Sequence, residues 1–238
     1  MHHIDTIILI GRPAAGKSEV IDFFKRKTSQ ELAEQFHMGP FEEMDDFPFV
    51  WECFEIDDIQ TKYGKPRLFT DEDYYWNDDY VWTLLLERLN LEFEKKLARD
   101  TDFFKENTLV IEFSRGGKTG FRDAFNTLSD KILERAAVVY IKVPYEESVR
   151  KNRRRFKPEL ADSILHHSLP DDKMEFYYKE NDWDELTEGK MDGHIEVKGH
   201  KLPFSVLDNM PEVTDTDEKL GPALSETMKR LYTRVQEK

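Results

Sequence analysis

The feature that most constrains the fold of this chain is a glycine-rich stretch close to its start. Residues 11–18 read GRPAAGKS and match the pattern G-x-x-x-x-G-K-[ST]. The preceding run, 4–10, is short and apolar, as in a strand that is buried on both faces. Residues 18–27 then place apolar side chains at helical spacing. The stretch therefore lies between a predicted strand and a predicted helix, which is the structural context that the pattern requires.

Each fixed position of this pattern has a physical task in holding a nucleotide phosphate. The glycines let the backbone curl so that N–H groups point at phosphate oxygens, at the positive end of the following helix. Lys17 would reach the β- and γ-phosphates, and the Ser18 hydroxyl would hold Mg²⁺. We therefore predict a site for ATP and Mg²⁺, formed by Gly11, Ala14, Ala15, Gly16, Lys17, Ser18 and Val20. The alternative is a surface turn that happens to contain a cation.

The amino-acid composition of the chain limits the kinds of molecule that it can bind. Lysine plus arginine number 35 against 49 aspartates plus glutamates, a net charge of −14, whereas binding to a nucleic-acid polymer needs a broad basic face. The single cysteine, Cys53, excludes a disulfide framework. No stretch approaches the roughly 20 apolar residues of a membrane span. We expect a cytoplasmic protein with a small-molecule partner, no nucleic-acid polymer and no membrane, and the oligomeric state stays open.

Strand and helix patterns alternate along the rest of the chain. Strand patterns fall at 41–46, 108–113, 136–143 and 204–207, with a hairpin at 194–202. Helix patterns fall at 79–99, 121–135, 145–157, 173–179 and 225–235, and 47–78 reads mostly as loop. This alternation predicts one α/β domain over 1–238, with three layers around a mainly parallel five-stranded sheet. We assign 47–107 to an inserted acceptor-binding lobe and 145–203 to a lid region.

The remaining motifs narrow the class of nucleotide-binding protein. A GTPase should carry a D-x-x-G switch and an N-K-x-D motif, and neither occurs in this sequence. Motor proteins of the helicase or AAA type need a longer chain. The classes that remain are a compact nucleotide-dependent phosphotransferase and an ATP-binding protein that has lost its catalytic activity.

A small-molecule kinase also needs carboxylates near the acceptor hydroxyl and the metal. Asp45 and Asp46 end the second strand pattern, at the carboxyl edge where ligands of open α/β sheets bind. Glu112 closes the third strand pattern beside the glycine-rich loop and is placed to hold a metal-bound water. The alternative for Asp45 and Asp46 is a solvated turn or a helix cap. The alternative for Glu112 is a glutamate at the edge of the core whose hydrogen bonds are all made within the protein.

Cations form the last group of candidates. Arg150, Arg153, Arg154 and Arg155 make the only dense basic cluster, and as part of a lid they would stabilise charge on the transferring phosphoryl group. We select Arg150 and Arg154 as catalytic; a solvated helix face is the alternative. Arg67 and Arg115 can hold an anionic group of the substrate or can be ordinary loop cations. His166 and His167 have no third metal ligand at suitable spacing and are read as lid surface.

Four segments together resemble the uridine kinase and nicotinamide riboside kinase branch of P-loop kinases. They are GRPAAGKS, EMDDFPF, LVIEF and VYIKVPYEESVRKNRRRF. The resemblance implies ATP-dependent phosphorylation of a primary hydroxyl on a ribose-like substrate, with Asp45 as the base and Glu112 near magnesium. The chain departs from that branch in its long, aromatic and acidic 47–107 segment and in an inserted hairpin at 181–203.

Two other functions stay open on the sequence. One is a nucleotide-binding regulatory or interaction protein, whose acidic and aromatic 47–80 segment would be a partner surface. The other is a kinase of nucleoside monophosphates, in which Arg67 or Arg115 would hold the phosphate of the acceptor.

Overall fold

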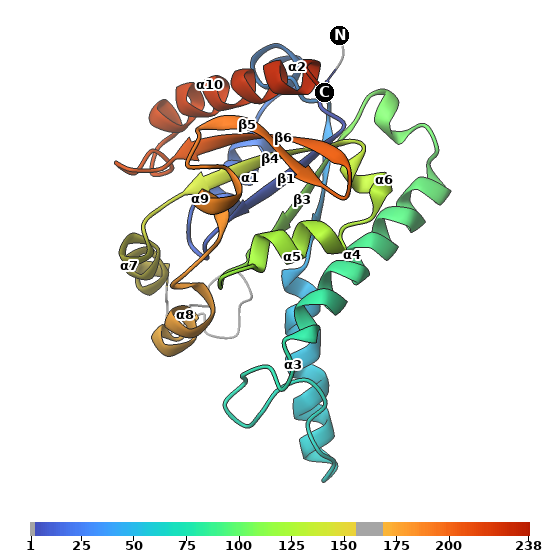
Figure 1. Cartoon of the computed structure of the whole chain (residues 1–238), viewed down its shortest axis with the longest axis vertical. Coiled ribbons are helices and arrows are strands. Elements are labelled where there is room, and N and C mark those ends of the chain that lie inside the picture. The colour runs from blue at the N-terminus through green and yellow to red at the C-terminus, as the bar shows by residue number, and fades with distance from the viewer. Residues whose placement is uncertain (1–2, 156–168) are drawn as a thin grey trace.

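The computed structural model describes residues 3–155 and 169–238, and its centre is a six-stranded sheet with helices on both faces (Figure 1). The strands are β1 (Thr6–Gly11), β2 (Phe41–Asp45), β3 (Thr108–Phe113), β4 (Ala136–Lys142), β5 (Asp192–Val197) and β6 (His200–Asp208). Their order is β2-β3-β1-β4-β6-β5, with every pair parallel except β5 with β6. The predicted α/β class is confirmed, and an antiparallel edge strand is added to the five expected.

Alternating side chains of the strands form two cores, which makes the domain three-layered. Ile8 and Ile10 face one core, and Ile7 and Leu9 face the other. The first core is covered by α4 (Tyr80–Arg99), α5 (Gly120–Thr127) and α6 (Asp130–Leu133). The second is covered by α1 (Lys17–Lys25), α2 (Ser29–Phe36) and α10 (Asp217–Gln236). Apolar burial on both faces explains why the strands read as continuous hydrophobic runs.

The remaining helices lie outside these two layers or at their ends. They are α3 (Phe47–Lys62), the short 3-10 helix η1 (Phe103–Lys105), α7 (Tyr145–Arg155), α8 (Asp171–Tyr178) and α9 (Trp183–Leu186). In Figure 1, α3 projects from the sheet edge beyond the rest of the molecule. No helix among the described residues is long and apolar enough to cross a membrane.

The reading of 47–78 mostly as loop was wrong, because α3 occupies half of it. The sequence pattern does not predict this helix, for two physical reasons. Pro48 falls in its first turn, where the missing N–H costs nothing. Apolar residues such as Trp51, Ile56 and Ile59 recur on several sides of the helix, so no single apolar face produces a clear period.

Two other boundaries differ from the sequence prediction. The hairpin at 194–202 and the last strand are one continuous unit, because β6 pairs with β5 on one side and with β4 on the other. Trp183 is buried and stacks on Tyr140 with ring centroids 4.5 Å apart. The region assigned to a lid, 145–203, therefore includes an edge strand and a core residue of the main body. Residues 156–168, with His166 and His167, lie outside the described part of the chain.

A buried carboxylate joins α3 to the loop that follows it. Asp57 of α3 has no exposed surface, and it accepts hydrogen bonds from the N–H groups of Leu68 at 2.5 Å and Thr70 at 2.7 Å. The N–H of Phe69 and the hydroxyl of Thr70 donate to it as well. Burial alone would raise the pKa of Asp57, but these hydrogen bonds outweigh it and lower the pKa. One side chain thus fixes the loop after α3 onto the helix.

We expect Asp57→Asn to lower the free energy of unfolding by about 1–3 kcal/mol, since it leaves buried N–H groups without a charged acceptor. The lowered pKa means that this contribution is present above roughly pH 4 and is lost as the pH falls through the folded-state pKa. Urea unfolding at several pH values, with hydrogen exchange of 63–70, measures both effects. Glu55→Gln, an exposed change on the same helix, is the control, and equal effects of the two variants would contradict the assignment.

Candidate active site

The glycine-rich loop has the backbone geometry that its sequence predicts. Gly16 has φ 118°, and a Cβ there would lie 2.7 Å from Cγ2 of Thr214. A Cβ on Gly11 would lie 2.8 Å from the carbonyl oxygen of Ile141 on the neighbouring strand. The first glycine thus permits close strand packing, and the second permits a left-handed turn directly before α1.

Side chains from distant segments support this loop from outside. Ser148 of α7 donates to the carbonyl of Pro13 at 2.6 Å, and Asn209 after β6 donates to the carbonyl of Ala15 at 2.8 Å. Arg12 donates to three carbonyls, those of Val143, Tyr178 and Lys179. The carbonyls of Pro13 and Ala15 thereby have partners outside the loop, while the first N–H groups of α1 have no partner within the helix. Such a helix start binds anions.

Lys17 and Ser18 begin α1 with different surroundings. The Lys17 ammonium lies 2.7 Å from Oγ of Ser114 and 3.7 Å from a carboxylate oxygen of Glu112, and its side chain is 7% exposed. Ser18 is exposed to solvent at the helix start. Val20 differs from the prediction, because its side chain lies in the core and its N–H donates to the carbonyl of Gly16. Val20 therefore has no free donor for a phosphate.

Two of the predicted carboxylates meet beside Lys17. In the register of β2 and β3, Asp45 stands opposite Glu112, and Glu112 stands opposite Leu9 of β1. Burial raises the pKa of Asp45 to about 7, with the negative charges of Glu112 and Asp46 adding to the effect. Burial also raises the pKa of Glu112, although the charge of Lys17 opposes this. A carboxylate that titrates near neutral pH is suited to accept a proton from a hydroxyl.

Arg115 and Arg67, the two candidates for holding a substrate anion, already have carboxylate partners. A guanidinium nitrogen of Arg115 lies 2.6 Å from Asp46 in a pair whose side chains are 5% and 6% exposed. The same guanidinium lies 4.9 Å from the ring of Trp82. Arg67 pairs with Asp58 of α3 at 2.9 Å and donates to Thr70 in the loop after α3. A substrate phosphate would have to compete with these carboxylates for either cation.

The arginines of α7 have separate partners. Arg150 pairs with Glu147 at 2.7 Å and Arg154 with Glu212 at 3.1 Å, and both side chains are more than half exposed. Arg153 pairs with Asp171 at 2.5 Å. Arg155, which the sequence analysis left unselected, pairs with Glu19 of α1 at 2.8 Å. Spacing within RKNRRR gave no basis for ranking these side chains, because adjacent helix positions point about 100° apart and only packing shows which face meets the loop.

The side-chain oxygens near Lys17 are suited to a Mg²⁺ ion that takes its remaining ligands from nucleotide phosphates. In the described parts of the chain, no group of three or more His, Cys, Asp or Glu side chains is arranged to hold a metal ion alone. Mg²⁺ in nucleotide sites uses one or two protein oxygens and takes its other ligands from phosphates and water. The Ser18 hydroxyl and the Glu112 carboxylate are protein oxygens of this kind.

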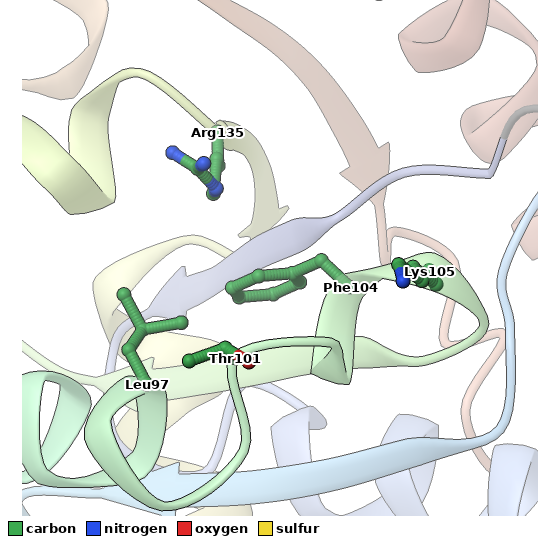
Figure 2. Close-up of a pocket in the computed structure, with 5 residues that line it drawn as sticks. All are labelled: Leu97, Thr101, Phe104, Lys105 and Arg135. Atoms are coloured by element: carbon green, nitrogen blue, oxygen red, sulfur yellow. The ribbon is translucent and has the colours of Figure 1, made fainter.

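A surface pocket of about 400 Å³ lies at the opposite, amino end of the strands (Figure 2). Its lining residues are Leu97, Thr101, Phe104, Lys105 and Arg135. Lys105 pairs with Asp102, and Arg135 lies over the Phe104 ring at 5.7 Å. Because ligands of open α/β sheets bind at the carboxyl ends of the strands, this pocket is separate from the candidate site.

No protein-family model and no curated protein matches the chain. Among solved structures, a sugar kinase from a Janibacter species is similar at 15% identity and a TM-score of 0.44, with 98% of this chain and 94% of that one covered. The protein TT1252 from Thermus thermophilus is similar at 13% identity and a TM-score of 0.42, with 99% and 97% covered. Likeness at this level carries no argument about activity, so the function is argued from the geometry of this chain.

We expect Asp45→Asn to gain stability relative to the wild type as the pH rises. An unfolded aspartate titrates near pH 4, whereas folded Asp45 titrates at about 7, so the folded state binds more protons between these values. Ionisation of Asp45 therefore removes stability as the pH rises through this window, and asparagine cannot ionise. Urea unfolding at pH 4, 6 and 8 measures the difference, with Glu43→Gln on the same strand as the control. A wild type that gains on the variant with rising pH would refute the raised pKa.

Proposed function

We propose that this protein transfers the γ-phosphate of ATP to a hydroxyl group of a small molecule. The observation that carries the proposal is the meeting of Lys17, Glu112 and Asp45 at the carboxyl ends of three adjacent strands. A cation at a helix start suits the donor phosphates, and a carboxylate with a pKa of about 7 suits the acceptor hydroxyl. A binding protein without chemistry has no need of the second group.

Each of these side chains has a separate role in the phosphoryl transfer. The N–H groups at the start of α1 and the Lys17 ammonium bind the β- and γ-phosphates. Asp45 accepts the proton of the acceptor hydroxyl while that oxygen bonds to the γ-phosphorus, and the bond from this phosphorus to the β–γ bridging oxygen breaks to release ADP. Ser18 and Glu112 would hold Mg²⁺, which would neutralise charge on the phosphate oxygens when bound. Ser114 orients the Lys17 ammonium through its 2.7 Å contact.

The acceptor we propose is a neutral hydroxylated molecule, such as a nucleoside or another ribose-like compound. A phosphorylated acceptor would have to reach Arg67 or Arg115, whose side chains are only 14% and 5% exposed, and displace the carboxylate that each already pairs with. The adjacent lobe supplies aromatic surface instead: Trp82 lies 5.6 Å from Trp76 and 5.6 Å from Tyr177 between ring centroids. Rings of this kind stack on sugars and bases.

Lys17→Met should lower the affinity for ATP by at least tenfold, because it removes the ammonium from the phosphate site; charge-assisted hydrogen bonds of this kind contribute roughly 1.5–3 kcal/mol. Calorimetric titration with Mg²⁺ and ATP measures the affinity. Lys25→Met, an exposed lysine on the same helix, is the matched control. Unchanged binding by the Lys17 variant would refute the nucleotide site.

Asp45→Asn should keep its ATP affinity and lose phosphotransfer by roughly 100-fold or more, the usual effect of removing a general base. ADP release is measured over a panel of nucleosides, other ribosides, small sugars and nucleoside monophosphates. A responding neutral compound identifies the acceptor, and a responding monophosphate would overturn the neutral-acceptor assignment. A panel without any response would favour a regulatory nucleotide-binding protein.

A further inference from the structure

One face of α7 lies against the glycine-rich loop, and only one of its four arginines is on that face. Ser148 identifies the face, because its hydroxyl donates to Pro13 in the loop at 2.6 Å. Lys151 and Arg155 follow at intervals of three and seven residues, which places them on the same side of a helix. Lys151 is 4% exposed, as expected for a residue on a packed face.

Arg155 completes this stripe with a contact to the start of α1. One guanidinium nitrogen lies 2.8 Å and 2.9 Å from the two carboxylate oxygens of Glu19. Glu19 directly follows Ser18, so the guanidinium is held beside the residues that would bind phosphate and magnesium. The side chain of Arg155 is 32% exposed, less than the values of 53% to 65% for Arg150, Arg153 and Arg154.

The other arginines of α7 point to different partners. Arg153 pairs with Asp171 of α8 through two of its nitrogens. Arg150 and Arg154 lie within 3.5 Å of Glu212, which also pairs with Lys151 at 3.0 Å. Glu212 lies in the segment after β6, so this cluster joins α7 to that segment. Arg155 is the member of RKNRRR that contacts α1.

We propose that Arg155 is the arginine that contacts the γ-phosphate during transfer, and that Glu19 holds it beside the glycine-rich loop until the nucleotide binds. This inference rests on the proposed function. A guanidinium makes paired hydrogen bonds equally well to a carboxylate and to a phosphate, so Glu19 and the γ-phosphate are interchangeable partners. The negative charge of the bound triphosphate draws the guanidinium from Glu19 to the transferring group. Arg155 thereby replaces Arg150 and Arg154 as the catalytic arginine.

The exposure of the Arg155–Glu19 pair supports this exchange. The two side chains are 32% and 41% exposed, so a ligand that arrives at the start of α1 can reach the guanidinium. An ion pair as exposed as this one contributes little to stability, so a phosphate group can displace the carboxylate.

The test compares Arg155→Met with Arg153→Met, which removes the same charge and an equally good ion pair from the same helix. We expect Arg155→Met to lower kcat by roughly 100-fold, in the range for loss of one transition-state donor. It should also lower the ratio of ATP affinity to ADP affinity by about tenfold, because the lost contact is to the γ-phosphate. Arg153→Met should leave both quantities within about twofold of the wild type. Loss of structure alone would not change the ratio between the two nucleotides.

Glu19→Gln supplies a second, independent measurement. Removing the competing carboxylate frees Arg155, so the ATP-to-ADP affinity ratio should rise by several-fold, and it should not rise in the double variant Glu19→Gln, Arg155→Met. An unchanged ratio in Arg155→Met, or the same loss in Arg154→Met, would overturn the assignment of Arg155. A Lys17→Met variant that still binds ATP normally would instead refute the nucleotide site itself, so the two failures are distinguishable.

Discussion

The rest of the site depends on the placement of one buried cation among carboxylates. The Lys17 side chain is 7% exposed, and its ammonium lies 2.7 Å from Oγ of Ser114, 3.5 Å from the carbonyl oxygen of Arg12 and 3.7 Å from the carboxylate of Glu112. A buried ammonium needs a partner of opposite charge, and two adjacent carboxyl groups such as Asp45 and Glu112 need a nearby cation or a retained proton, in agreement with the pKa of about 7 for Asp45. Lys17 and the two carboxyl groups therefore lower the free-energy cost of burying one another. The sheet achieves this by ending β2 and β3 in register next to the loop after β1.

Supporting contacts keep the glycine-rich loop in this arrangement without using its N–H groups. Ser148 and Asn209 donate to the loop carbonyls of Pro13 and Ala15, and Arg12 donates to carbonyls at the ends of β4 and α8. These partners lie more than a hundred residues from the loop in the sequence. The candidate site is thus assembled by long-range contacts around a short local motif. The motif allows the loop to adopt this backbone conformation, and the distant side chains hold the loop in it.

The sequence predicted the parts of the molecule whose signals are local. Continuous apolar runs identified the parallel strands, and the Gly11–Ser18 pattern identified the loop, because both depend on neighbouring residues alone. Helix α3 was missed because its apolar residues do not share one face. Helix α2 received no prediction, although Thr28 and Glu31 form a capping box that marks its start.

The partners of the charged side chains could not be predicted from the sequence. Nothing near Arg115 shows that Asp46 neutralises it, and nothing in RKNRRR shows that Arg155 reaches α1 while Arg154 reaches Glu212. Such choices follow from how whole elements pack against one another. The positions of Asp45 and Glu112 were predictable because strand ends have a known place in a parallel sheet, but the pKa of Asp45 depends on their actual separation and burial.

The attachment of the 68–70 loop to Asp57 has a consequence for how this protein can change. All the hydrogen bonds that the Asp57 carboxylate accepts come from the loop at 68–70, and none comes from the sheet. The loop is therefore fixed by helix α3 and not by the sheet that carries the glycine-rich loop. Substitutions of the exposed aromatic side chains in 63–78 can change the surface of this segment while the Asp57 contacts and the strand ends of the candidate site keep their residues.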